Sequence, residues 1–130
     1  MTQQTFCVLT RVHTKALTGE EMFVSAPRSA GDLAGVFEYV ENTGYFYYYD
    51  RGRIAGKRVV AAIRILTGKP DFAESDVIVR WTRNEEIVGL FIRGQLWAAF
   101  RGTKRFGGSY RPGSRPDIPD SVVAAFNETA

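Results

Sequence analysis

Short runs of aromatic and β-branched residues, separated by turn-forming residues, are the feature that most limits how this chain can fold. Successive side chains of a strand point to opposite faces of a sheet, so an apolar run that alternates over a few residues is typical of a strand. Gly, Pro, Asn, Asp and Ser between the runs supply turn chemistry. The runs occupy residues 6–12, 21–25, 33–40, 44–49, 58–66, 76–82, 87–92 and 95–100.

These runs predict a mainly β (α+β) domain. Residues 33–40 and 44–49 form a hairpin in this interpretation, and residues 76–100 form a three-strand meander. Residues 58–66 carry apolar side chains on both faces, which predicts a central strand. We expect a curved antiparallel sheet or half-barrel of about six to eight strands.

One short C-terminal helix is predicted around residues 119–127. Ile118, Val122, Ala125 and Phe126 recur there at helical spacing, and acidic residues precede and begin the segment. The helix is too short to cover a whole sheet, so sheet curvature or a second small sheet is expected to bury the remaining apolar face.

The length of 130 residues matches a single domain, residues 1–130. No apolar run approaches the roughly 20 residues needed to cross a bilayer. The first residues lack a basic start and a sustained apolar segment, which predicts a cytoplasmic protein without a secretion signal. Cys7 is the only cysteine, so an internal disulfide is excluded.

Charge is segregated along the chain, although the net charge is only +3. Residues 19–50 are acidic, whereas residues 51–70 and 87–116 carry mostly Arg and Lys. If the two basic stretches meet in space, their summed field attracts an anionic partner. The alternative is that the acidic stretch neutralises them within the fold.

No catalytic or metal-binding motif is present in the sequence. His13 is the only histidine, and no nucleophile motif accompanies it. The Cys and His spacings typical of metal sites are absent. We therefore expect no enzyme activity, no cofactor and no metal.

The segment Tyr45-Phe46-Tyr47-Tyr48-Tyr49 is the first candidate binding element. On a strand it sends three rings to one face and two to the other, so one set is expected to be partly exposed. Tyrosine suits an interface because its ring packs while its hydroxyl stays hydrated. Ordinary sheet packing is the alternative. The candidate binding residues here are Tyr45, Tyr47, Tyr49 and the following Arg51 and Arg53.

Residues 101–111 are the second candidate, because glycine, basic side chains and aromatic rings occur together there. Such a segment suits phosphate and base contacts. The alternative is a solvated loop between the sheet and the final helix. The candidate binding residues are Lys104, Arg105, Tyr110 and Arg111.

Three segments resemble a small bacterial family catalogued as a domain of unknown function, number 2251. They are Val36-Phe37-Glu38 with Thr43-Gly44-Tyr45-Phe46-Tyr47, then Val79-Arg80-Trp81, then residues 88–100. The resemblance spans about residues 22 to 110. Tyr39-Val40 replaces an acidic pair of that family, and Arg93-Gly94 stands where Asn-Gly is usual. The resemblance implies a shared fold and carries over no catalytic residue.

Together these features predict a non-catalytic protein-interaction module of bacterial or phage origin, with an immunity- or inhibitor-like role as its most concrete form. The alternative is a binder of nucleic acid or of a phosphorylated small molecule through the basic loops. Binding to phosphate weakens steeply as salt rises, which separates the two hypotheses.

Overall fold

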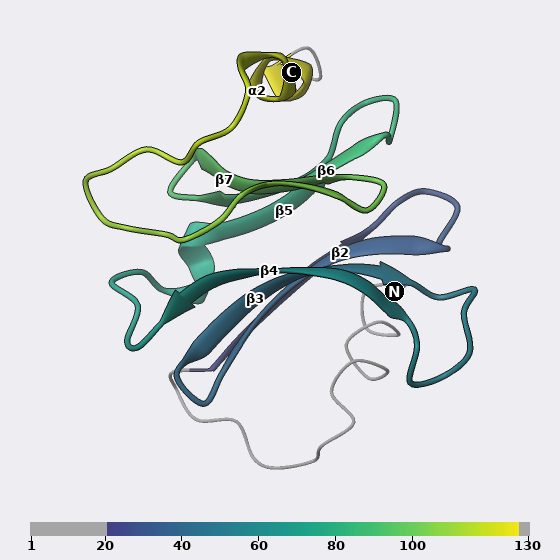
Figure 1. Ribbon diagram of the computed structural model, residues 1–130, viewed down its shortest axis with the longest axis horizontal. Coiled ribbons are helices and arrows are strands. Elements are labelled where there is room, and N and C mark those ends of the chain that lie inside the picture. Colours follow the sequence, from purple (N-terminus) through teal and green to yellow (C-terminus); the bar gives the residue numbers. More distant parts are fainter. Residues whose placement is uncertain (1–20, 128–130) are drawn as a thin grey trace.

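A computed structural model of the protein describes residues 21–127 (Figure 1). This range confirms the mainly β class and the short C-terminal helix. Its elements are β1 Met22–Pro27, β2 Leu33–Val40, β3 Thr43–Asp50, β4 Val59–Thr67, the 3-10 turn η1 Glu74–Asp76, β5 Val77–Trp81, β6 Ile87–Ile92, β7 Gln95–Arg101, β8 Lys104–Gly107 and α2 Asp120–Asn127. The strand expected at residues 6–12, together with Cys7 and His13, lies outside the described residues.

The strands divide equally between two antiparallel sheets that lie face to face (Figure 1). The first sheet has the order β1-β2-β3-β4 and the second β5-β6-β7-β8, so each is a simple meander. A second sheet therefore covers the apolar face that one short helix does not reach. None of the helices within residues 21–127 has the length and apolar character needed to cross a bilayer.

Two tight turns set the strand register. In the expected β2–β3 hairpin, Glu41 and Asn42 adopt φ values of 54° and 66°, which places Phe37 opposite Phe46. Arg93 and Gly94 at the β6–β7 turn have φ values of 52° and 81°. Positive φ at both central residues is the geometry that matches the twist of a two-residue hairpin.

The main core lies between the sheets. Phe37, Phe46 and Phe100 are fully buried there, and the Phe46 and Phe100 ring centroids are 5.2 Å apart. A second apolar cluster forms where α2 covers the outer face of the second sheet. Val122 and Phe126 pack there with residues of β6 and β7, as their helical spacing predicted.

The prediction that residues 58–66 form a central strand is wrong, because β4 is an edge strand. The outer edge of β4 is hydrogen-bonded by β8 and the segment that follows it. The backbone N–H of Ser109 donates to the Arg64 carbonyl at 3.3 Å, and that of Tyr110 donates to the Ile65 carbonyl at 2.6 Å. Arg105 Nε donates to the Ala62 carbonyl at 3.0 Å. β4 therefore has hydrogen-bond partners at its outer edge, and its buried side chains Ala61, Ile63 and Ile65 lie on one face.

The segment 101–111 is not simply a loop, because residues 104–107 form β8. β8 pairs with β7 and extends the predicted three-strand meander to four strands. Glycine and arginine lower strand propensity, so the pattern gave no sign of a strand there. Pairing with β7 supplies the stabilisation that the local sequence lacks.

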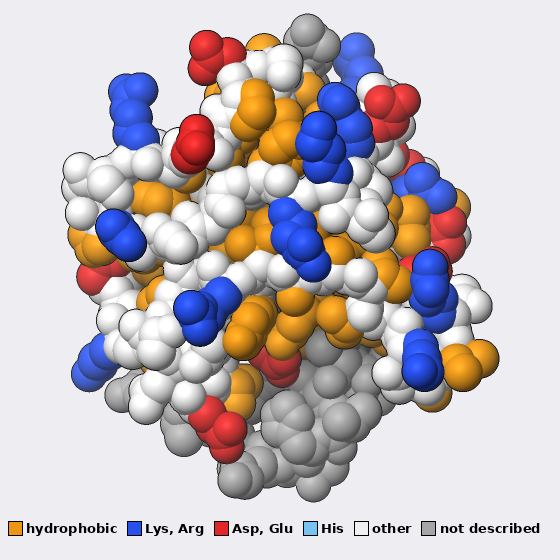
Figure 2. Space-filling model, viewed as in Figure 1, with side chains coloured by type: hydrophobic (Ala, Val, Ile, Leu, Met, Phe, Trp, Pro, Cys, Tyr) orange, Lys and Arg blue, Asp and Glu red, His pale blue; other side chains and the backbone are white. Residues whose placement is uncertain are grey.

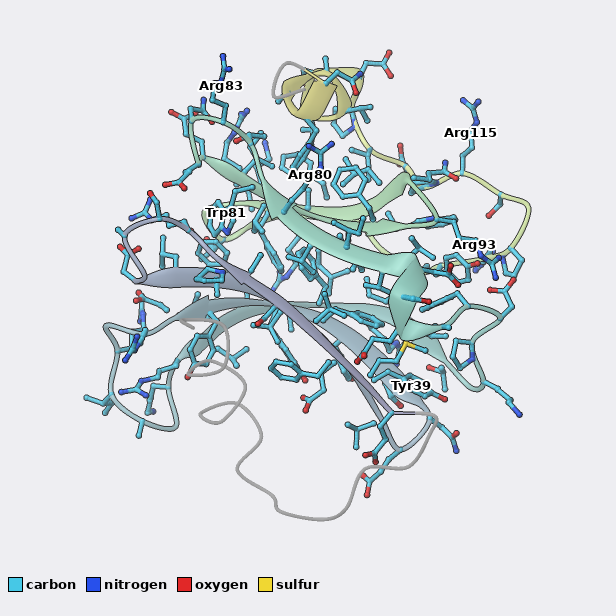
Figure 3. All side chains as sticks on the ribbon, turned by 180° about the vertical axis from the view of Figure 1, so that it is seen from behind. Tyr39, Arg80, Trp81, Arg83, Arg93 and Arg115 are labelled. Carbon is cyan, nitrogen blue, oxygen red and sulfur yellow. The ribbon has the colours of Figure 1, made fainter. Side chains whose placement is uncertain are left out.

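The opposite edge of the sandwich is joined by side chains. Trp81 Nε1 donates to the Ala26 carbonyl at 2.9 Å, and Figure 3 shows the Trp81 side chain between β5 and the first sheet. The backbone N–H of Phe23 donates to Glu74 Oε2 at 2.9 Å. Both lateral edges of the sandwich are therefore bridged, which fixes the two sheets relative to each other.

Replacing Asp32 by asparagine is expected to lower stability by up to about 1 kcal/mol at neutral pH. Arg28 donates to both carboxylate oxygens of Asp32, at 2.8 and 2.7 Å, and this side-chain hydrogen bonding lowers the pKa of Asp32 to about 2. A lowered folded-state pKa stabilises the fold above the unfolded value near 4 and loses that effect as pH falls toward 2. Thermal melts of both proteins between pH 7 and pH 2 check this. The two melting temperatures should converge at low pH, and a constant difference would contradict the expectation.

Candidate functional site

Four exposed cationic side chains lie on β4, β7 and β8, near the edge at which β4 adjoins β8. Arg101 and Lys104 face each other across the β7–β8 pairing. Arg105 reaches β4 through its bond to the Ala62 carbonyl, two residues before Arg64. We call Arg64, Arg101, Lys104 and Arg105 the basic seam. Both basic stretches of the sequence contribute to it, so the fold brings them together.

No acidic side chain of the described residues forms an ion pair with the basic seam. Each of its four side chains is exposed, and no carboxylate of residues 21–127 lies within ion-pair distance of any of them. On the face drawn in Figure 2, Lys and Arg side chains lie both near the middle and at the margins, with Asp and Glu side chains among them.

Two other arginines pair with carboxylates and hold loops in place. Arg28 pairs with Asp32 across the β1–β2 turn at 2.7 Å. Arg93 lies 3.6 Å from Asp71 and 3.8 Å from Asp76.

The tyrosine strand β3 alternates as predicted. Phe46 and Tyr48 point into the main core, while Tyr45 and Tyr47 lie half-buried on the outer face of the first sheet. Their rings stack on each other with centroids 5.8 Å apart and an interplanar angle of 14°. Tyr49, expected to be accessible, is buried in a small cluster with Ala34 and Val36.

An open hollow of about 270 Å³ lies beside the two half-buried tyrosines. Glu38 and Glu41 line it together with Tyr45 and Tyr47. Burial raises the pKa of Tyr47, with a further contribution from the charge of Glu38. The tyrosine face therefore has acidic side chains on one side, while Arg64 of the basic seam is the neighbour of Tyr45 on the other.

Arg51 and Arg53 lie in the loop that precedes β4 and do not join the basic seam. Arg53 Nε is 3.3 Å from Asp50 Oδ2, an acid at the end of β3. The loop also carries Ile54, which is 72% exposed. Arg53 therefore has a carboxylate neighbour, whereas Lys104 and Arg105 have none at ion-pair distance within residues 21–127.

Tyr110 and Arg111 follow β8 but point to different surroundings. The Tyr110 ring packs edge-on against Trp97, with centroids 4.8 Å apart, and its hydroxyl donates to Asp71 Oδ1 at 2.6 Å. Burial and this hydrogen bond raise the pKa of Tyr110 to about 12. Tyr110 thus fastens the chain after β8 to the β4–β5 loop, and only Arg111 is fully exposed.

Lys104 and Arg105 are therefore the two candidates that the fold places in the basic seam, and sequence reasoning missed Arg64 and Arg101. Both missed residues lie within the basic stretches, so the charge pattern pointed to them. Their spatial neighbours depend on how β4 and the β8 segment lie next to each other. No group of three or more His, Cys, Asp or Glu side chains suited to a metal ion occurs in the part of the chain that the structure describes.

Comparison with known proteins gives a family but no relative of known activity. A family model described as an uncharacterized protein conserved in bacteria (DUF2251) matches residues 16–118. Neither the curated proteins nor the solved structures contain a match to this chain.

Proposed function

The chain belongs to the bacterial family DUF2251, and from this premise we propose that it acts as a non-catalytic protein-interaction module in the cytoplasm. Membership confirms the resemblance carried by residues 36–47 and 79–100 and defines no activity. The proposal therefore rests on surface chemistry.

The basic seam is the observation that carries the proposal. Its cations stand on three strands, β4, β7 and β8, and backbone hydrogen bonds from Ser109 and Tyr110 to β4 hold the two sheets together beside them. Rigid, unpaired charge favours rapid and specific association with a surface of opposite sign. We propose that the partner is a protein with an acidic surface, and that an immunity- or inhibitor-like blocking role is the concrete form of this activity.

Groups with strongly shifted pKa values support binding rather than catalysis, because each has a structural partner. Asp32 is held by Arg28, and Tyr110 is held by burial and Asp71. These shifts arise from contacts that fasten loops, and structural pairs are a known source of such shifts.

Binding of nucleic acid or of a phosphorylated small molecule is the second candidate. Arg64 is the direct neighbour of Tyr45 across the β3–β4 pairing, and a guanidinium beside an aromatic ring suits a nucleotide. However, Glu38 is the direct neighbour of Tyr45 on its other side, so a phosphate chain that crosses these rings meets a carboxylate. For this reason we place nucleotide binding at these rings second.

Reversing two charges of the basic seam is expected to weaken partner binding at least about tenfold. The variant combines Arg64→Glu with Lys104→Glu, because neither side chain makes a hydrogen bond in the described structure. The control combines Lys57→Glu with Arg115→Glu, which changes the net charge equally outside the basic seam. Each protein is used to enrich partners from a nuclease-treated lysate of a bacterium that encodes this chain, and the recovered partner is purified and titrated at two salt concentrations.

The expected result is an acidic protein that binds the wild type and the control and loses affinity for the seam variant and at higher salt. Equal binding by both double variants would reject the basic seam as the interface. Recovery of nucleic acid alone from an untreated lysate, lost by the seam variant, would replace the protein partner by the second candidate.

A further inference from the structure

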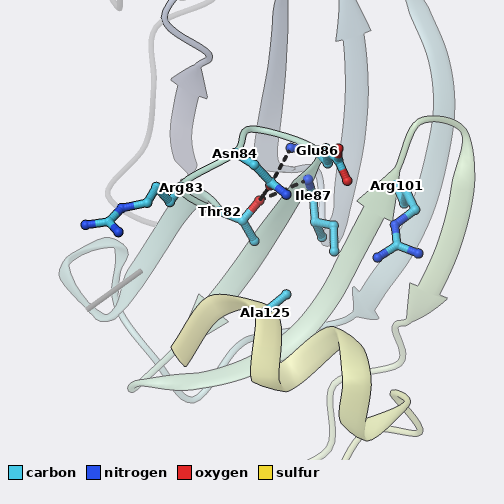
Figure 4. A pocket seen from close by; sticks show the side chains of 7 residues that line it. All are labelled: Thr82, Arg83, Asn84, Glu86, Ile87, Arg101 and Ala125. Atoms are coloured by element: carbon cyan, nitrogen blue, oxygen red, sulfur yellow. Dashed lines mark hydrogen bonds between the residues drawn. The ribbon is translucent and has the colours of Figure 1, made fainter. Parts of the chain in front are cut away.

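A hollow of about 410 Å³ lies between the β5–β6 turn, the end of β7 and helix α2 (Figure 4). Its floor is apolar, since Ile87 is buried and Ala125 is half-buried. Its rim is polar and includes Asn84, Glu86 and Arg101. An apolar floor with a few placed polar groups is the usual composition of a ligand site.

The side-chain amide of Asn84 has a fixed orientation at this rim. Its Oδ1 accepts hydrogen bonds from Thr82 Oγ1 at 2.7 Å and from the backbone N–H of Glu86 at 3.2 Å. The carbonyl side of the amide is therefore occupied by the turn. The Nδ2 donor has no acceptor among the described residues, and Figure 4 shows it directed toward Ile87.

Arg101 supplies positive charge on the other side of the hollow. In Figure 4, Ile87 lies between Asn84 and the guanidinium of Arg101, whereas Arg83 points away. Within residues 21–127, Arg101 has no carboxylate at ion-pair distance, and that includes Glu86. A guanidinium and an amide N–H are donors that suit carboxylate oxygens, and the apolar floor suits an apolar stem.

We propose that this hollow binds a carboxylate carried on a short apolar stem, as an anchor site for one residue of the partner. The identity of that partner rests on the proposed function, but the chemistry of the site does not. The carboxylate is either an acidic side chain or a chain terminus. A singly charged group is favoured over phosphate, because Glu86 on the rim repels a dianion more strongly.

Three short peptides test the site and distinguish the two sources of carboxylate. Acetyl-Ala-Leu-Glu-amide offers only a side-chain carboxylate, acetyl-Ala-Leu-Gln with a free C-terminus offers only a terminal one, and acetyl-Ala-Leu-Gln-amide offers neither. Each is titrated into the full chain while amide chemical shifts are recorded by NMR. Saturable shifts at Asn84, Ile87 and Ala125 are expected with one or both acidic peptides, and none with the neutral peptide.

Two variants alter the hollow without altering the cations of the basic seam. Asn84→Asp keeps the Oδ1 acceptor of the turn and replaces the Nδ2 donor by a negative oxygen, so acidic peptides should bind at least about tenfold more weakly. Asn42→Asp, in the β2–β3 turn, is the matched control and should bind as the wild type does. Ala125→Phe fills the hollow by volume and should also abolish the shifts.

Binding of the neutral peptide equal to that of the acidic ones would overturn the inference, as would wild-type affinity in both Asn84→Asp and Ala125→Phe. The double variant Arg64→Glu and Lys104→Glu separates this outcome from failure of the proposed function. It should lose the protein partner and keep the peptide shifts. Loss of partner binding in that variant with no peptide shifts in the wild type would leave the proposed function standing and reject the anchor site.

Discussion

Replacing Gly35 by valine is expected to lower the free energy of unfolding by about 3 kcal/mol, because side chains forced into a packed interior are costly. Gly35 lies on β2 where the two sheets face each other. A Cβ atom there would lie 2.6 Å from Val88 Cγ2 and 3.0 Å from Val79 Cγ1, both from the second sheet. Neither valine can move far in a close-packed core, so the sheets themselves must separate.

Urea denaturation of the two proteins measures this difference. Gly52→Ala is a suitable control, because Gly52 is exposed in the β3–β4 loop and a Cβ there meets only Asp50 Oδ1, at 3.3 Å. The control should unfold near the wild-type midpoint. A midpoint for Gly35→Val as high as that of the control would show that the sheets are not in contact at this position.

Gly35 also shows why the sequence predicts the strands but not their division into two sheets. Alternation and turn residues are local signals, and they defined the β2–β3 hairpin and the β5–β6–β7 meander correctly. The close approach of Gly35 to Val79 and Val88 joins residues far apart in the sequence. Nothing in the local pattern marks it, so a curved sheet, a half-barrel and a second sheet stayed open as solutions.

The misplacement of β4 has a related cause. The outer edge of an apolar strand can be paired with another strand of its own sheet or with a segment that comes from another sheet. The two situations leave the same pattern in the sequence. Here the backbone of Ser109 and Tyr110 supplies the cover. That segment contains glycine and arginine, so its part in the sheet edge becomes visible only in three dimensions.

The candidate site, like the fold, could be predicted from the sequence only in part. Charge blocks are a property of the sequence, and they correctly indicated which stretches carry the exposed cations. Which residues become neighbours of each cation depends on strand pairing: Arg101 faces Lys104, Arg64 faces Tyr45, and Arg53 pairs with Asp50. Tyr110, predicted from its place in the basic segment, packs against Trp97 and donates a hydrogen bond to Asp71.

Helix α2 connects stability with the proposed anchor site. Phe126 is 1% exposed and meets Phe91 edge-on, with ring centroids 5.2 Å apart. The Arg80 guanidinium lies 4.7 Å from the Phe91 centroid and 5.6 Å from the Phe126 centroid, and Figure 3 shows it between the sheet and the helix. Gly89 leaves room for this ring, since a Cβ there would lie 2.7 Å from Phe126. The neighbouring Ala125 is thereby held over Ile87.

Replacing Phe126 by alanine is therefore expected to remove about 3–5 kcal/mol of packing free energy, the usual cost of deleting a buried phenylalanine. A helix of eight residues has little stability of its own, so this loss should release α2 before the sandwich unfolds. Amide chemical shifts of residues 120–127 should move toward unfolded values, while those of β2 and β3 stay in place. Binding of acetyl-Ala-Leu-Glu-amide should fall in parallel, because Ala125 no longer forms a wall of the hollow.

Val123→Ala on the same helix is the control, because Val123 is 38% exposed and its truncation should change stability by less than about 1 kcal/mol. Native shifts for α2 in Phe126→Ala would show that the helix is held by contacts other than this ring. Released α2 with unchanged peptide affinity would show that the helix does not form the wall of the site. Released α2 together with weakened peptide binding is expected only if packing at Phe126 holds the anchor site in shape, since the substitution changes no charge and leaves Asn84 and Arg101 untouched.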